Sequence, residues 1–199
     1  KISIGHPEQQ KMIKFLSNDF SEARWRKAAL KNAFVLLSKH RYMDAACFFL
    51  LAECLKDCVN VLFKQVKDLD LAIGVCRVFE GDNGPVLGEF LTQQILPNAI
   101  LQNDRWISSF VYWKLRRHDK AIRTLVMDPF DLEKDTGLVD MDGGVSKSFL
   151  AEDPALLMLY SHLRKRNIKY FLGSLKVEGE LEYSLIGRVA DILRRMGCD

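Results

Sequence analysis

Three cysteine thiols lie close together in the stretch YMDAACFFLLAECLKDCVNVLF, which covers residues 42–63. Cys54 and Cys58 have a spacing that a zinc site could use, but a structural zinc site needs four ligands, typically as two pairs. No second pair follows, and the nearest histidine, His40, belongs to a preceding turn. Cys47 stands in a continuous apolar run, and a free cysteine behaves as a small buried hydrophobe. The pattern predicts that these thiols pack in an interior and hold no metal.

Two glycine-containing segments resemble ligand-binding loops without completing them. GDNGPVLG, residues 81–88, lacks the Lys-Ser/Thr of a phosphate-binding loop and follows a predicted helix rather than a strand. DMDGG, residues 140–144, resembles part of a calcium loop, but Leu138 and Phe149 would then occupy the first and last ligand positions. No serine, histidine and carboxylate form a nucleophile motif. The sequence therefore predicts neither an enzyme nor a bound cofactor.

The elements that carry these residues are predicted to be almost entirely helical. Leucine is far more frequent than threonine, and the period-two alternation typical of strands is almost absent. The net charge of +3 comes from interleaved bases and acids, which is not the concentrated basic surface that nucleic-acid binding needs. No apolar run approaches the roughly 20 residues that cross a bilayer. These features indicate a helical protein that binds neither nucleic acid nor the membrane interior.

A recurring aspartate indicates a series of short helices. Asp44, Asp57 and Asp70 are spaced 13 residues apart, and Asp119 occurs in a similar context. On one continuous helix this spacing would turn successive side chains by about 140°, whereas each aspartate suits the N-cap or first turn of a separate helix. The predicted fold is all-α: an α-solenoid of stacked short helix-turn-helix units with one long irregular loop.

Composition divides the chain into three stretches. Residues 1–126 are predicted to form helical solenoid repeats. Residues 127–153 are acidic, contain glycine and lack sustained periodicity, so we expect the long irregular loop there. Residues 154–199 are predicted to form the C-terminal helices of the same solenoid, with a regular last helix over about 179–196. The chain begins at Lys1 without a methionine, and we interpret it as an excerpt from a larger protein.

Two tryptophans and two basic clusters could contact a partner. Aromatic residues dominate interface hot spots, although the apolar surroundings of these tryptophans favour a place in the core. The clusters KLRRH (114–118) and LRKRN (163–167) could meet an acidic partner or an anionic membrane surface, or could simply neutralise helix C-termini. The candidate partner-binding residues are Trp106, Trp113, Arg116, Arg117, Arg164, Lys165 and Arg166.

A long run of the sequence resembles a known family. RWRKAALKNAFVLLSKHRYMDAACFFLLAECLKDCVNVLFKQVKDLDLAIGVCRVFEGDNGPVL, residues 24–87, is similar to the large subunit of the RAVE complex and to its animal relatives, the rabconnectin and DmX-like proteins. The resemblance continues through LPNAI, through NDRWISSFVYWKLRRHDKAI and, more faintly, through LMLYSHLRKR. The resemblance covers nearly all of the chain, and its specificity comes from these segments taken together.

The resemblance implies a role as a non-enzymatic scaffold. The RAVE complex regulates the vacuolar and endosomal proton-pumping ATPase (V-ATPase) by promoting assembly of its peripheral catalytic sector onto its membrane sector. The implied partners are subunits of that peripheral sector, a smaller RAVE subunit and a Skp-type adaptor. The implied location is the cytoplasm, with recruitment to vacuolar and endosomal membranes. A vesicle-coat or tethering solenoid is the alternative interaction module, and a metal-dependent domain is the alternative from another class.

Overall fold

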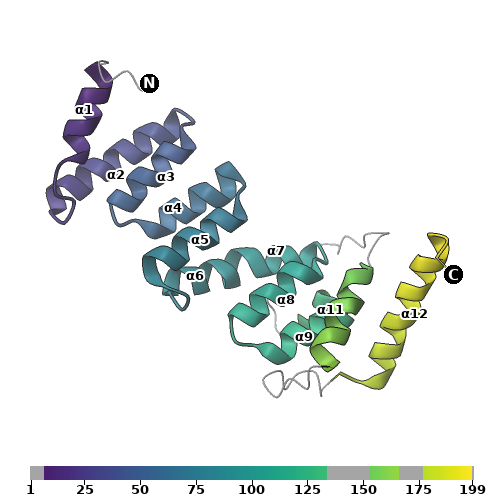
Figure 1. Ribbon diagram of the computed structural model, residues 1–199. Coiled ribbons are helices and arrows are strands. Elements are labelled where there is room, and N and C mark those ends of the chain that lie inside the picture. Colours follow the sequence, from purple (N-terminus) through teal and green to yellow (C-terminus); the bar gives the residue numbers. More distant parts are fainter. Residues whose placement is uncertain (1–6, 134–152, 166–176, 199) are drawn as a thin grey trace. The chain divides into compact units, whose positions relative to one another are not determined.

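The computed structural model describes residues 7–133, 153–165 and 177–198 (Figure 1). These residues lie in helices and in the turns and short links between them, with no β-strand among them, so the predicted all-α class is confirmed. The chain forms two compact units, Lys1–Leu87 and Gly88–Asp199. In the described parts of both units, helices follow one another through short turns, as the helix-turn-helix prediction requires.

Unit 1 is a succession of helices in which neighbours along the chain pack on one another. Contacts join α2 to α3, α3 to α4, and α4 to α5. The boundary with unit 2 falls inside α6. The elements are α1 (Pro7–Leu16), α2 (Ala23–Ser38), α3 (Tyr42–Leu51), α4 (Leu55–Val61), the π-helical turn η1 (Leu62–Val66), α5 (Leu69–Glu80) and α6 (Pro85–Phe90).

Unit 2 continues the same kind of packing and adds a contact between distant segments. Helix α8 packs on α7 and on α9, while α11 packs on both α9 and α12. Figure 1 shows α11 lying between α9 and α12. The elements are the π-helical turn η2 (Leu91–Ile95), α7 (Leu96–Leu101), α8 (Arg105–Lys114), α9 (His118–Val126), α10 (Pro129–Glu133), α11 (Pro154–Lys165) and α12 (Gly179–Arg195).

Aspartates begin several of these helices. The Asp68 carboxylate accepts a hydrogen bond from the backbone N–H of Leu71 at 2.8 Å, and Asp104 accepts one from Ile107 at 3.0 Å. Each bond satisfies one of the N–H groups that a helix start leaves without an intrahelical partner. The predicted placement of the recurring aspartates is confirmed, because first turns contain Asp44, Asp57, Asp70 and Asp119.

One turn geometry joins helix to helix repeatedly. His40, Glu53, Asn103 and Arg116 all have a left-handed backbone conformation, with φ between 52° and 61°. The residue after each donates its N–H to the carbonyl five positions earlier, which is the Schellman arrangement, and the next helix begins one residue later. Lys67, with φ of 65°, occupies the same place before α5. The left-handed residues are of five different types, so the sequence alone does not reveal this repeat.

Two predicted helix boundaries differ from the structure. Ser21 has a side chain typical of an N-cap, and the sequence predicts that it begins the second helix, but α2 begins at Ala23 with Glu22 in the capping position. The sequence predicts that Pro97 stops or kinks its helix; it does not stop it, because Pro97 is the second residue of α7. The π-helical turn η2 directly precedes Pro97 and widens the helix there. Widened turns and proline often coincide where a helix adjusts its hydrogen bonding.

The predicted loop over 127–153 is in part helical. Pro129–Glu133 forms α10, which at five residues is too short to show helical periodicity in the sequence. Residues 134–152 lie outside the described residues. The predicted boundaries of the stretches 1–126 and 154–199 differ from the boundary between the two compact units. These predicted boundaries stay predictions.

The cysteines have unequal surroundings. Cys58 and Cys76 are buried and Cys54 is half-buried, but Cys47 is exposed, so the interior position predicted for Cys47 is wrong. Helix α3 is apolar along most of its length, and the sequence therefore did not show which face packs inward. Burial raises the pKa of the Cys58 thiol to about 12 and that of Cys76 to about 11, so both stay protonated at neutral pH. Within the described ranges, no group of three metal-ligating side chains is assembled.

Replacing Cys58 with serine is expected to destabilise unit 1 by about 1–3 kcal/mol, because a hydroxyl would be buried among apolar side chains. Cys47→Ser is the matched control, and we expect its effect to stay within about 0.5 kcal/mol because that side chain faces solvent. Hydrogen exchange of the α3 and α4 amides measures both variants in the same unit. Equal destabilisation by the two substitutions would contradict the observed difference in burial.

A groove lined by aromatic side chains between α8, α9 and α11

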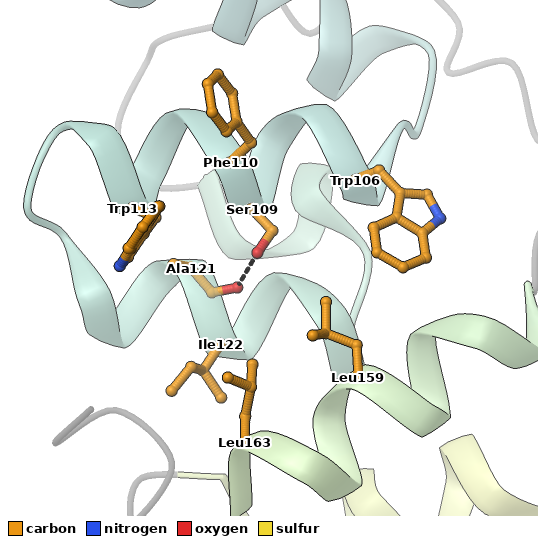
Figure 2. A pocket seen from close by; sticks show the side chains of 8 residues that line it. All are labelled: Trp106, Ser109, Phe110, Trp113, Ala121, Ile122, Leu159 and Leu163. Atoms are coloured by element: carbon orange, nitrogen blue, oxygen red, sulfur yellow. Dashed lines mark hydrogen bonds between the residues drawn. The ribbon is translucent and has the colours of Figure 1, made fainter. Parts of the chain in front are cut away.

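Unit 2 contains an apolar groove where α8, α9 and α11 meet (Figure 2). Its volume is about 280 Å³. Segments well separated in the sequence supply its walls, since α11 follows α9 only after the 127–153 stretch. The lining residues are Trp106, Ser109, Phe110, Trp113, Ala121, Ile122, Leu159 and Leu163.

Helix α8 contributes a row of aromatic rings. Trp106, Phe110 and Trp113 are spaced four and three residues apart, which places them on one face of the helix. All three are between 37% and 49% exposed. The opposite face of α8 is buried through Val111 and Tyr112. The sequence favoured core positions for the two tryptophans, and this is wrong: α8 is apolar nearly all round, so local pattern could not tell its covered face from its open one.

The floor of the groove rests on the core of unit 2. Ile122 of α9 is buried, and Leu159 and Leu163 of α11 pack against the same cluster from the other side. The Ser109 hydroxyl donates a hydrogen bond to the carbonyl oxygen of Ala121 at 2.7 Å, which ties α8 to α9 (Figure 2). The buried members of this cluster are Ile122, Leu125, Val126, Leu156, Tyr160, Leu185 and Val189.

A hydrogen bond fixes one end of the aromatic row. The Trp106 indole N–H donates to a carboxylate oxygen of Asp153 at 3.0 Å. The other carboxylate oxygen of Asp153 accepts from the backbone N–H of Ala155 at 2.9 Å, at the start of α11. One side chain therefore holds the beginning of α11 against the beginning of α8, while Trp106 remains 41% exposed.

Basic residues follow the other end of the row. Arg116 and Arg117 are exposed and come three and four residues after Trp113, in the turn between α8 and α9. Lys165 is exposed at the last position of α11, two residues after the groove residue Leu163. The structure thus brings both predicted tryptophans and part of each basic cluster to one region of unit 2.

The remaining predicted site residues have other roles or positions. Arg164 is exposed and forms an ion pair with Glu182 of α12. Arg166 lies outside the described residues. The site prediction missed Phe110, Leu159 and Leu163, although the spacing of each with neighbouring apolar residues on its own helix was visible.

Comparison with known proteins shows which family this chain belongs to. The description "RAVE protein 1 C terminal" matches residues 1–199, the whole chain. The chain belongs to the RAVE protein 1 C-terminal family. The resemblance seen in the sequence is thereby confirmed.

Family relatives come from distant organisms. The chain is 68% identical over its full length to "Regulator of V-ATPase in vacuolar membrane protein 1" of Saccharomyces cerevisiae, and 34% identical to the protein of that name in Schizosaccharomyces pombe. It is 32% identical to human "DmX-like protein 1" over 77% of its length. The chain spans only 15%, 16% and 5% of these three proteins, respectively.

The chemistry of the groove in this RAVE-family chain suits contact with a protein rather than catalysis. Its lining residues include no acid, base or thiol, and the Ser109 hydroxyl is already engaged. A small-molecule site usually combines a volume of about 300–1,000 Å³ with several polar groups that fix orientation. The volume of this groove lies just below that range, and its lining lacks such groups. A few apolar side chains from another helix would fill it.

Proposed function

We propose that this chain is a non-enzymatic scaffold segment that helps assemble the peripheral catalytic sector of the vacuolar-type proton ATPase onto its membrane sector. Two relatives that align with the whole chain are named regulators of that ATPase. Short stacked helices suit a scaffold, because each contacts its neighbours and leaves outer faces for partners. The described residues that line the groove offer apolar contact and no reactive group, which supports binding over chemistry.

The observation that carries the proposal is the exposed aromatic row over the groove. Trp106, Phe110 and Trp113 present large apolar surface at one side of unit 2, and such rings are typical anchors of an interface. The positive side chains of Arg116 and Arg117 follow Trp113 in the chain, and Lys165 follows the groove residue Leu163 on α11. A complementary partner is an amphipathic helix with acidic residues beside its apolar stripe. We assign this helix to a subunit of the peripheral sector.

Other parts of the proposal concern the complex around this segment. A smaller RAVE subunit and a Skp-type adaptor are further proposed partners, and neither nucleic acid nor a cofactor takes part. The proposed location is the cytoplasm, with recruitment to vacuolar and endosomal membranes through the bound partners. Among the described helices, none has both the length and the apolar character required to span a bilayer.

Replacing Trp113 with alanine is expected to weaken binding to the peripheral-sector subunit by at least about tenfold, because an aromatic anchor would be lost from the groove. Isothermal titration of the chain against the separately purified peripheral-sector subunits, at low ionic strength, measures this effect. Met158→Ala is the matched control: Met158 is an exposed apolar residue of α11 that does not line the groove. Circular dichroism verifies that both variants keep their helices.

Charge reversal tests the electrostatic part of the same contact. Arg117→Glu should weaken the complex and reduce the dependence of its affinity on salt. If no peripheral-sector subunit binds the unchanged chain at low salt, the proposed function fails. If a subunit binds and Trp113→Ala leaves its affinity unchanged, the scaffold contact lies elsewhere and the assignment of the groove fails.

A further inference from the structure

Helix α12 carries two apolar rows, and unit 2 buries only one of them. Leu185 and Val189 belong to the buried cluster that α12 shares with α9 and α11. A second row points away from that cluster. Tyr183 is 79% exposed, Ile186 is 45% exposed, and Leu193 is also exposed.

The second row has the spacing of a helix-pairing surface. Tyr183, Ile186, Ala190 and Leu193 follow one another at intervals of three, four and three residues. At about 100° per residue, these four side chains fall within an arc of about 80° on the helix. Intervals that alternate between three and four place apolar side chains along one seam between two helices. Singly exposed apolar residues are common on protein surfaces, but four in one seam indicate a contact.

The middle of this seam permits close approach of another helix. Gly187 lies beside the row, is exposed, and has no heavy atom within 4 Å of the position that a Cβ would take. Ala190 is also small and exposed. Large side chains at both ends with small residues between them allow two helix backbones to approach at the centre of the seam.

Two residues of opposite charge lie beside the row, one near each of its ends. Glu180 comes seven residues before Gly187, and Arg194 comes seven residues after it. Because seven residues are nearly two helical turns, all three lie along one side of the row. Glu180 and Arg194 are both exposed. Arg194 contacts Asp191 of its own helix at 3.1 Å, and such an exposed pair contributes little and can rearrange.

We propose that two copies of this chain pair through α12, antiparallel, about a two-fold axis near Gly187. Antiparallel pairing sets Tyr183 of one copy against Leu193 of the other, and Ile186 against Ala190. It also sets Glu180 of each copy near Arg194 of the other, so that opposite charges meet twice. A two-fold contact requires one surface to be complementary to itself, and the charge order along α12 has this property. The pairing does not rest on the proposed function.

The pairing is weak in the isolated chain. The row from Tyr183 to Leu193 extends about 15 Å along the helix, at 1.5 Å per residue. A single pair of helices of this length buries an area at the low end of specific interfaces. We therefore expect a reversible equilibrium between monomer and dimer that is visible only at high protein concentration.

Sedimentation equilibrium of the 199-residue chain over a wide concentration range tests the pairing. The unchanged chain should show a monomer–dimer equilibrium. Ile186→Glu, which places a charge in the seam, should weaken dimerisation at least about tenfold. Met158→Glu is the matched control, because Met158 is exposed on α11 and lies outside the seam, and it should leave the equilibrium unchanged.

A charge exchange tests the antiparallel register. Glu180→Arg alone and Arg194→Glu alone should each weaken dimerisation, since like charges would meet twice. An equimolar mixture of these two variants should dimerise again. In the mixed dimer one copy carries arginine at both positions and the other carries glutamate at both, so opposite charges meet at each contact. Native mass spectrometry with one variant isotopically labelled identifies the mixed dimer.

Three outcomes would overturn the proposal. A chain that stays monomeric at every concentration would leave the seam to a different protein or to another part of a longer polypeptide. An unchanged equilibrium for Ile186→Glu would place the dimer contact elsewhere. Failure of the mixture to dimerise would exclude the antiparallel register centred near Gly187. All of these measurements use the chain by itself, so a failed contact with the ATPase subunits affects none of them.

Discussion

Truncating Leu125 to alanine should lower the free energy of unfolding of unit 2 by about 3 kcal/mol. Leu125 lies in the last turn of α9 and has no exposed surface. The cluster around it draws on three helices, with Leu156 from α11 and Leu185 from α12 also buried. The substitution removes apolar contact and leaves a cavity that helices held on several sides cannot readily close.

The measurement must separate the two units, because a whole-chain melting curve would combine them. Hydrogen exchange of amides in α9 and α11 reports on unit 2, and exchange in α3 and α4 reports on unit 1. Leu125→Ala should accelerate exchange in unit 2 alone. Met158→Ala, at an exposed site on α11, is the control and should change stability by less than about 0.5 kcal/mol. Equal effects of the two variants would mean that the cluster is not the core of unit 2.

Much of the fold could be predicted because it depends on local signals. Asp104 stands before an apolar run, a pattern typical of an N-cap, and it caps α8. The last helix was predicted over about 179–196, and α12 spans Gly179–Arg195 because apolar residues recur on one face between the N-cap residue Glu178 and Gly197. N-caps, helical periodicity and terminating glycines act within a few residues of themselves, so a single sequence shows them.

The open faces of the helices could not be predicted in the same way. Cys47 and Trp113 both lie in helices with apolar side chains on most sides, and both are exposed. Which side of such a helix is covered depends on what packs there, and the neighbour can be distant in sequence. The groove shows this directly: Trp113 of α8 and Leu163 of α11 line it together, although they are 50 residues apart. No short-range pattern predicts that pairing.

The outer row of α12 was missed for a related reason. In the sequence, the most regular apolar row of α12 runs through Leu185 and Val189, and Tyr183 and Ile186 fall outside it. Only the structure separates the two rows, because it shows one of them packed in the cluster and the other exposed to solvent. A helix with two apolar faces thus contributes both to the stability of unit 2 and to the contact that we propose between copies.

The Asp128→Ala substitution should destabilise unit 2 by about 3 kcal/mol, although Asp128 itself is partly exposed. Its carboxylate lies 2.5 Å from the guanidinium of Arg105, whose side chain is only 4% exposed. Without Asp128 the arginine would keep a buried positive charge that has lost this carboxylate, and this costs more than the loss of an exposed ion pair. Asp191→Ala, which removes the carboxylate of the exposed pair with Arg194, is the matched control and should cost less than about 1 kcal/mol.

Two further variants distinguish the effect of the Asp128 charge from the effect of its hydrogen-bonding group on Arg105. Asp128→Asn keeps an acceptor near Arg105 but removes the negative charge, so its effect should fall between those of Asp128→Ala and the unchanged chain. Combining Asp128→Ala with Arg105→Met removes the buried charge and should recover part of the stability. Exchange of the α8 and α9 amides measures each variant. Because Arg105 directly precedes Trp106, loss of the pair should also loosen the first turn of α8, where the aromatic row begins. If the Asp128→Ala variant unfolds no more readily than the Asp191→Ala variant, Arg105 does not depend on the Asp128 carboxylate. The position of the first turn of α8 would then depend on the Trp106–Asp153 hydrogen bond instead.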